Sequence, residues 1–120
     1  MADIVTLRLN LDFRRVYARG KAVTAPALVV YYMRNRAGIC RIGITASKKT
    51  GNAVQRNRAR RIIREGVRGV LPLVSGSCGY DFVFVARSRT KQLKSTDITR
   101  VALAALKKEG LIPADAKSAD

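Results

Sequence analysis

The chain has 120 residues, enough for one domain with a modest core. Hydrophobic residues make up 48% of it, a content that disordered chains lack. Twenty-four Lys and Arg against eight Asp and Glu give a formal net charge of +16, and self-repulsion of that size indicates a polyanionic partner. Sixteen of the 24 basic residues are Arg, whose planar guanidinium binds phosphate with two hydrogen bonds and stacks on nucleobases. The composition therefore favours RNA or DNA over a membrane as the partner.

Several other classes are disfavoured. The chain has no His and no CxxC pair, so a zinc site is not expected. Cys40 and Cys78 are predicted to be reduced and to lie in or near the core, with a disulfide between them as the alternative. No apolar run approaches the roughly 20 residues of a membrane helix. The first residues, which include Asp3, lack the pattern of a signal peptide. We therefore expect a cytoplasmic protein without membrane association.

A helix is predicted over the first part of the chain, from Leu7 to Arg19, because apolar residues there recur with the helical period. Asn10 or Asp12 could cap its start, and Gly20 would end it as a C′ residue.

Three strands are predicted next, over Lys21–Thr24, Ala27–Met33 and Cys40–Ser47, with a hairpin turn at Asn35–Gly38 before the third. Alternation in the third strand divides its side chains between two faces: Ile42, Ile44 and Ala46 on one, and Arg41, Gly43, Thr45 and Ser47 on the other.

The second half begins with a basic loop at Lys48–Gly51. A helix should follow from Asn52 to about Val70, because Gln55 stands three residues after Asn52 in the spacing of a capping box. The remaining predictions are a strand over Tyr80–Ala86, a helix capped by Ser95, Thr96 or Asp97 and stopped by Gly110, and a polar tail from Pro113.

These elements predict one α+β domain over residues 1–120, in the order α-β-β-β-α-β-α. Its helices would pack on a four-stranded sheet, with an ordered core at about 7–110 and a polar tail at 113–120.

The second predicted helix is crowded with Arg. On a helical wheel with about 100° per residue and Arg56 at zero, the basic residues span an arc from about 0° to 140°, and the complementary arc is apolar. Like charges one turn apart repel by a few tenths of a kcal/mol per pair, so a purely structural helix would rarely collect them, although a merely solvated face is the alternative. Lys48 and Lys49 precede the helix N-terminus, which itself favours phosphate. The basic face consists of Arg56, Asn57, Arg60, Arg61, Arg64 and Arg68, with Arg58 nearby.

This stretch resembles the signature of the bacterial ribonuclease P protein subunit. It reads SKK at 47–49, GNAV at 51–54, RNR at 56–58, a basic pair at 60–61 and RE at 64–65. The resemblance spans roughly Leu7 to Leu106, and also includes Asp12, Phe13, Val16, Tyr17 and Gly20 upstream, and Asp81, Phe82, Ala86 and Arg87 downstream.

The resemblance implies that the chain helps to remove the 5′ leader of precursor tRNA, as a subunit of an endoribonuclease whose catalytic groups belong to a large RNA. That RNA would hold the required Mg²⁺, while the protein alone binds no cofactor. The predicted partners are ribonuclease P RNA and precursor tRNA, with no obligate protein partner. The resemblance also implies a left-handed β-α-β crossover, against the usual right-handed rule. The RNA-facing residues would be Arg56, Asn57, Arg58, Arg60, Arg61 and Arg64, with Arg87 a further possible contact.

The family's leader-binding cleft lies between the first helix and the sheet, and the matching residues here are Phe13, Tyr17, Val29 and Tyr31. Their spacing suits this role, since i,i+4 residues share a helix face, i,i+2 residues share a sheet face, and aromatic stacking holds single strands. The alternative is that all four are ordinary core residues. One departure from the family pattern is Thr6 before Leu7, where an Arg is usual, so a basic N-terminal contact would be weaker or shifted.

The sequence offers little for catalysis by the protein itself. It has no His for acid–base chemistry, no Gly-rich phosphate loop of the GxxxxGK[ST] type, and carboxylates too scattered for a two-metal site. Two other functions stay open: a structural RNA-binding or ribosomal protein of similar fold, and a cationic membrane-surface protein. The second is disfavoured because the apolar helix face consists of Ala, Ile and Val, which suit a core.

Overall fold

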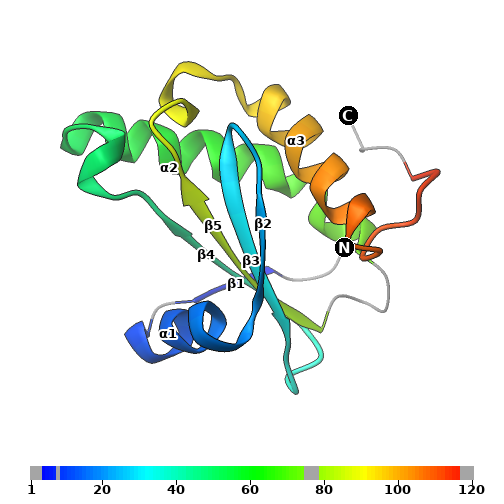
Figure 1. Ribbon diagram of the computed structural model, residues 1–120. Helices are drawn as coiled ribbons and strands as arrows, with labels where there is room; N and C mark the ends of the chain where they lie inside the picture. The colour runs from blue at the N-terminus through cyan, green and yellow to red at the C-terminus, as the bar shows by residue number, and fades with distance from the viewer. Residues whose placement is uncertain (1–3, 8, 75–78, 117–120) are drawn as a thin grey trace.

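The computed structural model describes residues 4–7, 9–74 and 79–116, and these form one mixed sheet with helices on both faces (Figure 1). The predicted single-domain α+β sandwich is confirmed. The strands are β1 (Ile4–Thr6), β2 (Lys21–Thr24), β3 (Leu28–Arg34), β4 (Cys40–Thr45) and β5 (Tyr80–Ala86). The helices are α1 (Asn10–Arg19), α2 (Ala53–Arg68) and α3 (Ser95–Lys108), with short 3-10 turns at Lys48–Thr50, Leu71–Leu73 and Thr90–Gln92.

The predicted count of four strands is wrong, because β1 adds a fifth among the described residues. The order across the sheet is β1-β4-β5-β3-β2. The predicted hairpin turn at Asn35–Gly38 is therefore wrong: β5 lies between β3 and β4, so this segment is a loop between strands that do not pair with each other. β1 runs parallel to β4, with Ile4 opposite Cys40 and Thr6 opposite Ile42. It was missed because three residues are too few to show a period, and because its only strand partner lies some 36 residues further along the chain.

β5 is the central strand and connects the two halves of the sheet. It pairs with β4 in parallel and with β3 antiparallel, and the β4–α2–β5 segment is the predicted β-α-β crossover. The hand of that crossover stays a prediction from the family resemblance. Because β5 is covered on both sides, Phe82, Val83 and Phe84 are all fully buried.

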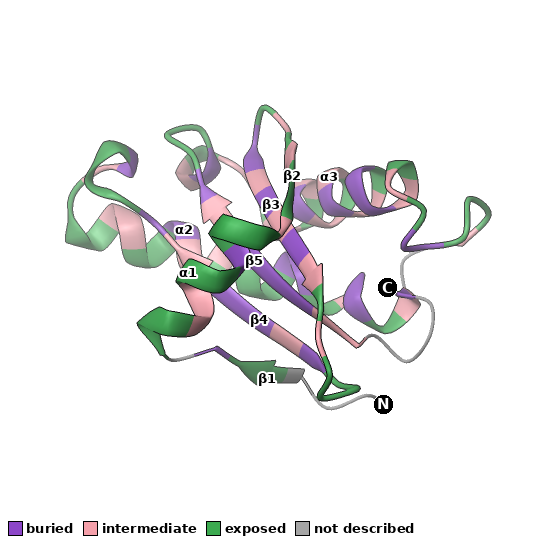
Figure 2. Cartoon of the chain, turned by 60° about the horizontal axis from the view of Figure 1, so that its bottom comes forward, coloured by how far each residue is buried: buried purple, intermediate pink, exposed green. Residues whose placement is uncertain are grey.

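The two faces of the sheet have different covers. α2 and α3 pack together on one face and enclose the main core, which includes Leu28, Val30 and Ile63. α1 alone lies against the other face, over β3 and β5, where the buried cluster is only Leu7, Val16 and Val83 (Figure 2). The α1 face of the sheet is therefore only partly closed, and this is where a groove can exist.

The helix ends follow the predictions in part. The capping box at α2 is confirmed, because the Asn52 side chain accepts from the Gln55 backbone N–H and the Gln55 side chain accepts from the Asn52 backbone N–H. α1 begins at Asn10 rather than Leu7, with Leu9 at the N-cap and no side-chain cap, so the prediction of Asn10 or Asp12 as cap is wrong.

The other ends also differ in detail. α3 has Lys94 at its N-cap, so Ser95, Thr96 and Asp97 lie inside the helix, and the Asp97 carboxylate accepts the Lys94 backbone N–H. Gly20 is extended rather than left-handed; it is needed because a Cβ would lie 2.5 Å from the Val16 carbonyl oxygen. α2 ends at Arg68 and β4 at Thr45, each two residues before the expected limit.

The C-terminal part of α3 is held to the sheet by a polar contact. The Tyr32 hydroxyl donates to Glu109 Oε1 at 2.5 Å, and burial together with this bond raises the pKa of Tyr32 to about 12. Gly110 ends the helix at φ +77°, as predicted, and Leu111 and Ile112 then return into the core. Cys40 is buried, while Cys78 lies outside the described residues. Among the described helices, none is long and apolar enough to cross a membrane.

Gly66 is the point of closest approach between α2 and α3, and it generates a stability prediction. A Cβ there would lie 2.6 Å from Ile98 side-chain atoms and 2.8 Å from the Ser95 carbonyl oxygen. We expect Gly66→Ala to lower the free energy of unfolding by about 1–2 kcal/mol, because overpacking outweighs the gain in helix propensity. Urea unfolding measures this change.

Gly69→Ala is the matched control, since its nearest neighbour would be Thr99 Cγ2 at 3.8 Å. Its free energy of unfolding should stay within about 0.5 kcal/mol of the wild type. Equal effects of the two substitutions would contradict close packing at Gly66.

Candidate nucleic-acid interface

α2 presents a basic surface opposite its buried face. Ala59, Ile63, Gly66 and Val67 are buried against the sheet and α3, and Val70 beyond the helix end is buried too. The exposed polar positions are Asn57, Arg58, Arg61, Arg64, Glu65 and Arg68. We call Arg58, Arg61, Arg64 and Arg68 the arginine face of α2.

Arg56 and Arg60 are placed differently from the sequence expectation, because both are half-buried at the edge of the packed face. Arg60 donates to Asn57 Oδ1 at 2.9 Å and to the Ala46 carbonyl at 3.4 Å, while Arg56 donates to the Gly51 carbonyl at 3.4 Å. Val67, which the helical wheel places between them, is fully buried. The basic arc is therefore centred nearer to Arg61, Arg64 and Arg68 than to Arg56.

The basic loop before α2 is held by the turn that follows β5. The Lys91 ammonium donates to the Thr50 carbonyl at 2.6 Å, and the Ser88 hydroxyl donates to the Lys49 carbonyl at 3.3 Å. Lys48 and Lys49 are exposed at this position. Lys91 thus adds positive charge at the start of α2, a contribution that only the fold could reveal because 41 residues separate it from Thr50.

The predicted cleft residues meet between α1 and the sheet. Phe13 lies over Gly43 of β4, so closely that a Cβ on Gly43 would come within 2.5 Å of the ring. Tyr17 packs edge-on against Tyr31, with ring centroids 4.9 Å apart at 86°, and its hydroxyl lies 3.4 Å from Thr45 Oγ1. The absence of a side chain at Gly43 is what lets the helix and its aromatic rings approach the sheet.

These aromatic residues line an open surface as well as a small core. Tyr17 is 41% exposed, and Phe13, Val29 and Tyr31 are half-buried. Phe13, Tyr17 and Thr45 border a hollow of about 330 Å³ together with Asn10 and Arg14. We call this hollow the aromatic cleft. Val29 lies on the same sheet face, two register rows from Tyr31 and opposite Val85, and neither Val29 nor Tyr31 lines the hollow itself.

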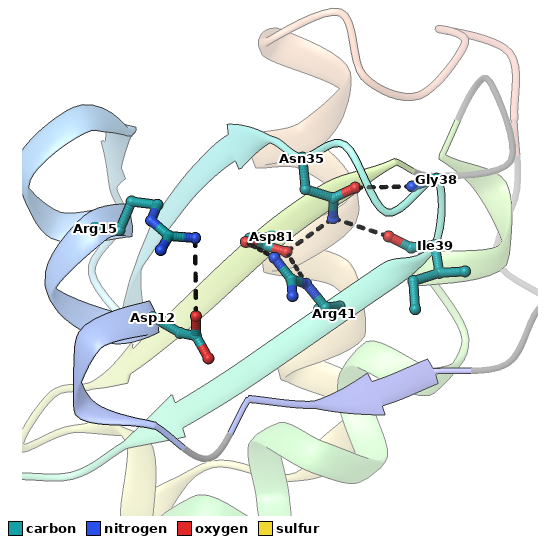
Figure 3. A network of polar contacts seen from close by, with 7 residues as sticks. All are labelled: Asp12, Arg15, Asn35, Gly38, Ile39, Arg41 and Asp81. Carbon is teal, nitrogen blue, oxygen red and sulfur yellow. Dashed lines mark hydrogen bonds and ion pairs between the residues drawn. The ribbon is translucent and has the colours of Figure 1, made fainter.

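A buried ion pair organises the far end of this sheet face (Figure 3). Asp81 is only 2% exposed, and its two oxygens accept from Arg41 at 2.7 and 2.8 Å. Asn35 also donates to Asp81 at 2.8 Å, donates to the Ile39 carbonyl, and accepts the Gly38 N–H in the loop between β3 and β4. The hydrogen bond to Asp81 raises the pKa of Arg41, so the guanidinium stays charged.

Sequence reasoning missed a second basic concentration beside this ion pair. Six arginines from α1, the end of β3, the loop after it and β4 border a hollow of about 890 Å³. The signal was present as the Arg14-Arg15 pair and as Arg34 and Arg36 around Asn35, but their convergence depends on how α1 crosses the sheet. Arg87, a possible contact in the sequence reading, is exposed and donates to the Ala25 carbonyl at 3.0 Å.

The described residues show no cluster of three or more His, Cys, Asp or Glu that could hold a metal ion. Asp81 is engaged by Arg41 and Asn35, and Asp12 and Asp97 each form an i,i+3 ion pair at 3.9 and 3.7 Å. What the arrangement offers is cationic and aromatic surface.

Comparison with known proteins agrees with this geometry. The family model described as Ribonuclease P matches residues 1–110. The chain belongs to the ribonuclease P protein family. The ribonuclease P protein component of Clostridium botulinum is 41% identical over 105 residues, covering 88% of this chain and 94% of the relative. That of Pelotomaculum thermopropionicum is 42% identical over 108 residues, covering 90% and 95%.

Solved structures of the family share the fold. The ribonuclease P protein of Staphylococcus aureus is 31% identical, with a TM-score of 0.75, covering 89% of this chain and 96% of that one. The protein from Thermotoga maritima is 27% identical, with a TM-score of 0.73, covering 86% and 96%. As a ribonuclease P protein component, the chain has a role in tRNA processing.

The Arg41–Asp81 pair leads to a prediction. We expect Asp81→Ala to lower the free energy of unfolding by about 3–5 kcal/mol, because it leaves a half-buried guanidinium without its carboxylate. Asp12→Ala, which removes a half-buried carboxylate whose contact with Arg15 is a long one of 3.9 Å, should cost no more than about 1 kcal/mol. Chemical denaturation of both variants measures the difference, and similar losses would contradict the central place of the buried pair.

Proposed function

We propose that this chain is the protein subunit of ribonuclease P. In this proposal it binds the catalytic RNA through the arginine face of α2 and holds the 5′ leader of precursor tRNA in the aromatic cleft. Together these contacts promote the Mg²⁺-dependent endonucleolytic removal of the leader, which gives the mature tRNA 5′ end. The protein would act in the cytoplasm and need no further protein partner.

The observation that carries the proposal is the juxtaposition of two unlike surfaces, one basic and one aromatic. Thr45 borders the aromatic cleft and stands three residues before Lys48, in the basic loop that leads into α2, a span of at most about 10 Å along the chain. Arg60 of α2 also donates to the carbonyl of Ala46, the residue after Thr45. One surface has the guanidinium groups that suit phosphates of a folded RNA, and the other has aromatic rings that suit unpaired bases. A molecule that binds both surfaces brings a single strand next to a structured RNA.

The proposed contribution of the protein is positioning and charge neutralisation. Phosphates of the leader and of the catalytic RNA repel one another, and a chain with a net charge of +16 between them lowers that repulsion. The cleavage chemistry and its Mg²⁺ ions would then belong mainly to the RNA. In the protein, the most buried carboxylate, Asp81, is engaged by Arg41 rather than turned to solvent.

Reconstitution tests the proposal. The protein is mixed with a bacterial ribonuclease P RNA and a precursor tRNA at low Mg²⁺, and the cleavage rate is followed as protein is added. We expect clear enhancement, because the protein replaces part of the screening that Mg²⁺ gives. Absence of enhancement at every protein concentration would overturn the subunit assignment.

The arginine face of α2 predicts a salt effect. Arg61→Gln with Arg64→Gln should weaken binding to the catalytic RNA and lower the log–log salt slope by about 0.7–0.9 for each lost phosphate contact. These two are preferred to Arg60, because Arg60 also donates to the Ala46 carbonyl. Arg100→Gln with Lys108→Gln on α3 removes the same charge elsewhere and serves as the control. An unchanged slope in the α2 variant would argue against this face.

The aromatic cleft predicts a substrate effect. Tyr31→Ala removes the ring that Tyr17 packs against, so the reconstituted enzyme should bind precursor tRNA less tightly by about 1–3 kcal/mol. Mature tRNA, which lacks the leader, should bind almost as before. Equal losses for the two tRNAs would assign Tyr31 to core packing instead.

A further inference from the structure

The loop after β5 touches the basic turn that precedes α2, and the proposed function does not use this contact. β4 and β5 are parallel, with Thr45 opposite Val85, so the segments that follow them leave the sheet at the same edge. The segment after β4 leads to the 3-10 turn Lys48–Thr50, which we call the basic turn. The segment after β5, residues 87–92, is called the β5 loop. Parallel pairing therefore places the two connections beside each other.

The β5 loop is itself fixed to the sheet. Thr90 is fully buried, and its hydroxyl donates to the Ala27 carbonyl and accepts the Arg87 backbone N–H at 2.9 Å. The Arg87 guanidinium donates to the Ala25 carbonyl at 3.0 Å. These bonds tie the loop to the connection between β2 and β3, so the loop forms a firm support for a neighbouring segment.

Two donors of the β5 loop hold the backbone of the basic turn. The Lys91 ammonium donates to the Thr50 carbonyl at 2.6 Å, and the Ser88 hydroxyl donates to the Lys49 carbonyl at 3.3 Å. Thr50 is only 1% exposed, whereas Lys48 and Lys49 are exposed. The backbone of the turn is thus bound to the protein, while its two lysine side chains face solvent.

Lys91 would be an unfavourable residue if it served folding alone. It is half-buried beside a turn that already carries two lysines, in a chain with a net charge of +16, so its charge adds repulsion. None of the ion pairs within the described ranges involves Lys91. Its charge instead strengthens the bond to the Thr50 carbonyl, since charge-assisted hydrogen bonds are about twice as strong as neutral ones. An anionic partner at the turn would remove the repulsion and leave the strong bond.

We propose that Lys91, assisted by Ser88, is a positioning residue for RNA binding. It holds the basic turn so that Lys48 and Lys49 meet phosphates of the RNA in a fixed geometry. The inference rests on the proposed function, since it assumes that this turn and α2 lie against the catalytic RNA. It adds a residue that acts on the RNA through other side chains. A turn that is already held in the free protein loses less conformational entropy on binding.

The first measurement uses the free protein. Lys91→Met removes the ammonium and keeps a side chain of similar length, while Lys91→Arg keeps both charge and donors. NMR order parameters of the backbone amides at 48–51 should fall in Lys91→Met and stay near the wild-type values in Lys91→Arg. The urea midpoint should change little, because the main core is not altered. Unchanged order parameters in Lys91→Met would overturn the inference without any RNA.

The second measurement is the affinity for a ribonuclease P RNA. Lys91→Met should weaken binding by roughly three- to tenfold, and Lys91→Arg should restore most of the affinity. Ser88→Ala, which changes no charge, should weaken binding about twofold. Lys108→Met, which removes the same charge from an exposed position on α3, should bind like the wild type.

A double-mutant cycle separates positioning from direct contact. With Lys48→Gln and Lys49→Gln already present, Lys91→Met should have little further effect, because Lys91 acts through those two side chains. An undiminished effect there would mean that Lys91 contacts the RNA itself, and an equal loss in Lys108→Met would assign the effect to net charge. Either result overturns the inference and leaves the proposed function standing. If the wild type neither binds the RNA nor enhances cleavage, the proposed function fails and the positioning role fails with it.

Discussion

The buried ion pair between Arg41 and Asp81 connects β4 to β5 on the face of the sheet that α1 covers. Arg41 and Asp81 are register partners in the parallel pairing of β4 with β5, and Asn35 brings the loop between β3 and β4 to the same carboxylate. In a chain with a net charge of +16, an almost inaccessible negative charge at this point lowers the local repulsion among arginines that this loop and α1 place nearby. The pair joins β4 to β5, and Asn35 connects the end of β3 to both strands.

The unequal covering of the sheet separates stability from binding. The face under α2 and α3 carries the large core, where Phe82, Phe84 and Ile63 are fully buried. The face under α1 has a much smaller cluster and leaves Tyr17 and Leu11 exposed. Substitutions on the α1 side can therefore alter the proposed contacts with RNA while the main core remains intact, apart from positions such as Asp81 and Gly43 that hold the two parts together.

Local patterns explain what could be predicted from the sequence. The strand alternation of β4, the capping box at Asn52 and the left-handed Gly110 each depend on residues a few positions apart, and each is present in the structure. The family signature also placed the aromatic residues on α1 and β3. The start of α1 was misplaced because Leu9 caps it without a side-chain bond, so no sequence marker exists there.

The features that escaped prediction are non-local. β1 depends on a partner far along the chain, and the inward turn of Arg60 depends on the Ala46 carbonyl, which the helical wheel does not contain. The arginine-lined hollow beside Arg41 needs α1 to cross the sheet at one particular place, which Gly43 permits by leaving room for Phe13. Charge and hydropathy counts could show that many arginines exist, but not that six of them would converge.

The central position of β5 also has a consequence for how the chain folds. β3 and β4 are neighbours along the chain, but they do not pair with each other. Both pair with β5, which is synthesised only after α2. Until Tyr80–Ala86 has left the ribosome, the sheet cannot close and the apolar side of α2 has only part of its final partner surface. Such non-local pairing slows folding and leaves apolar surface exposed during synthesis. The same strand that holds the finished molecule together therefore makes its assembly a late and largely concerted event.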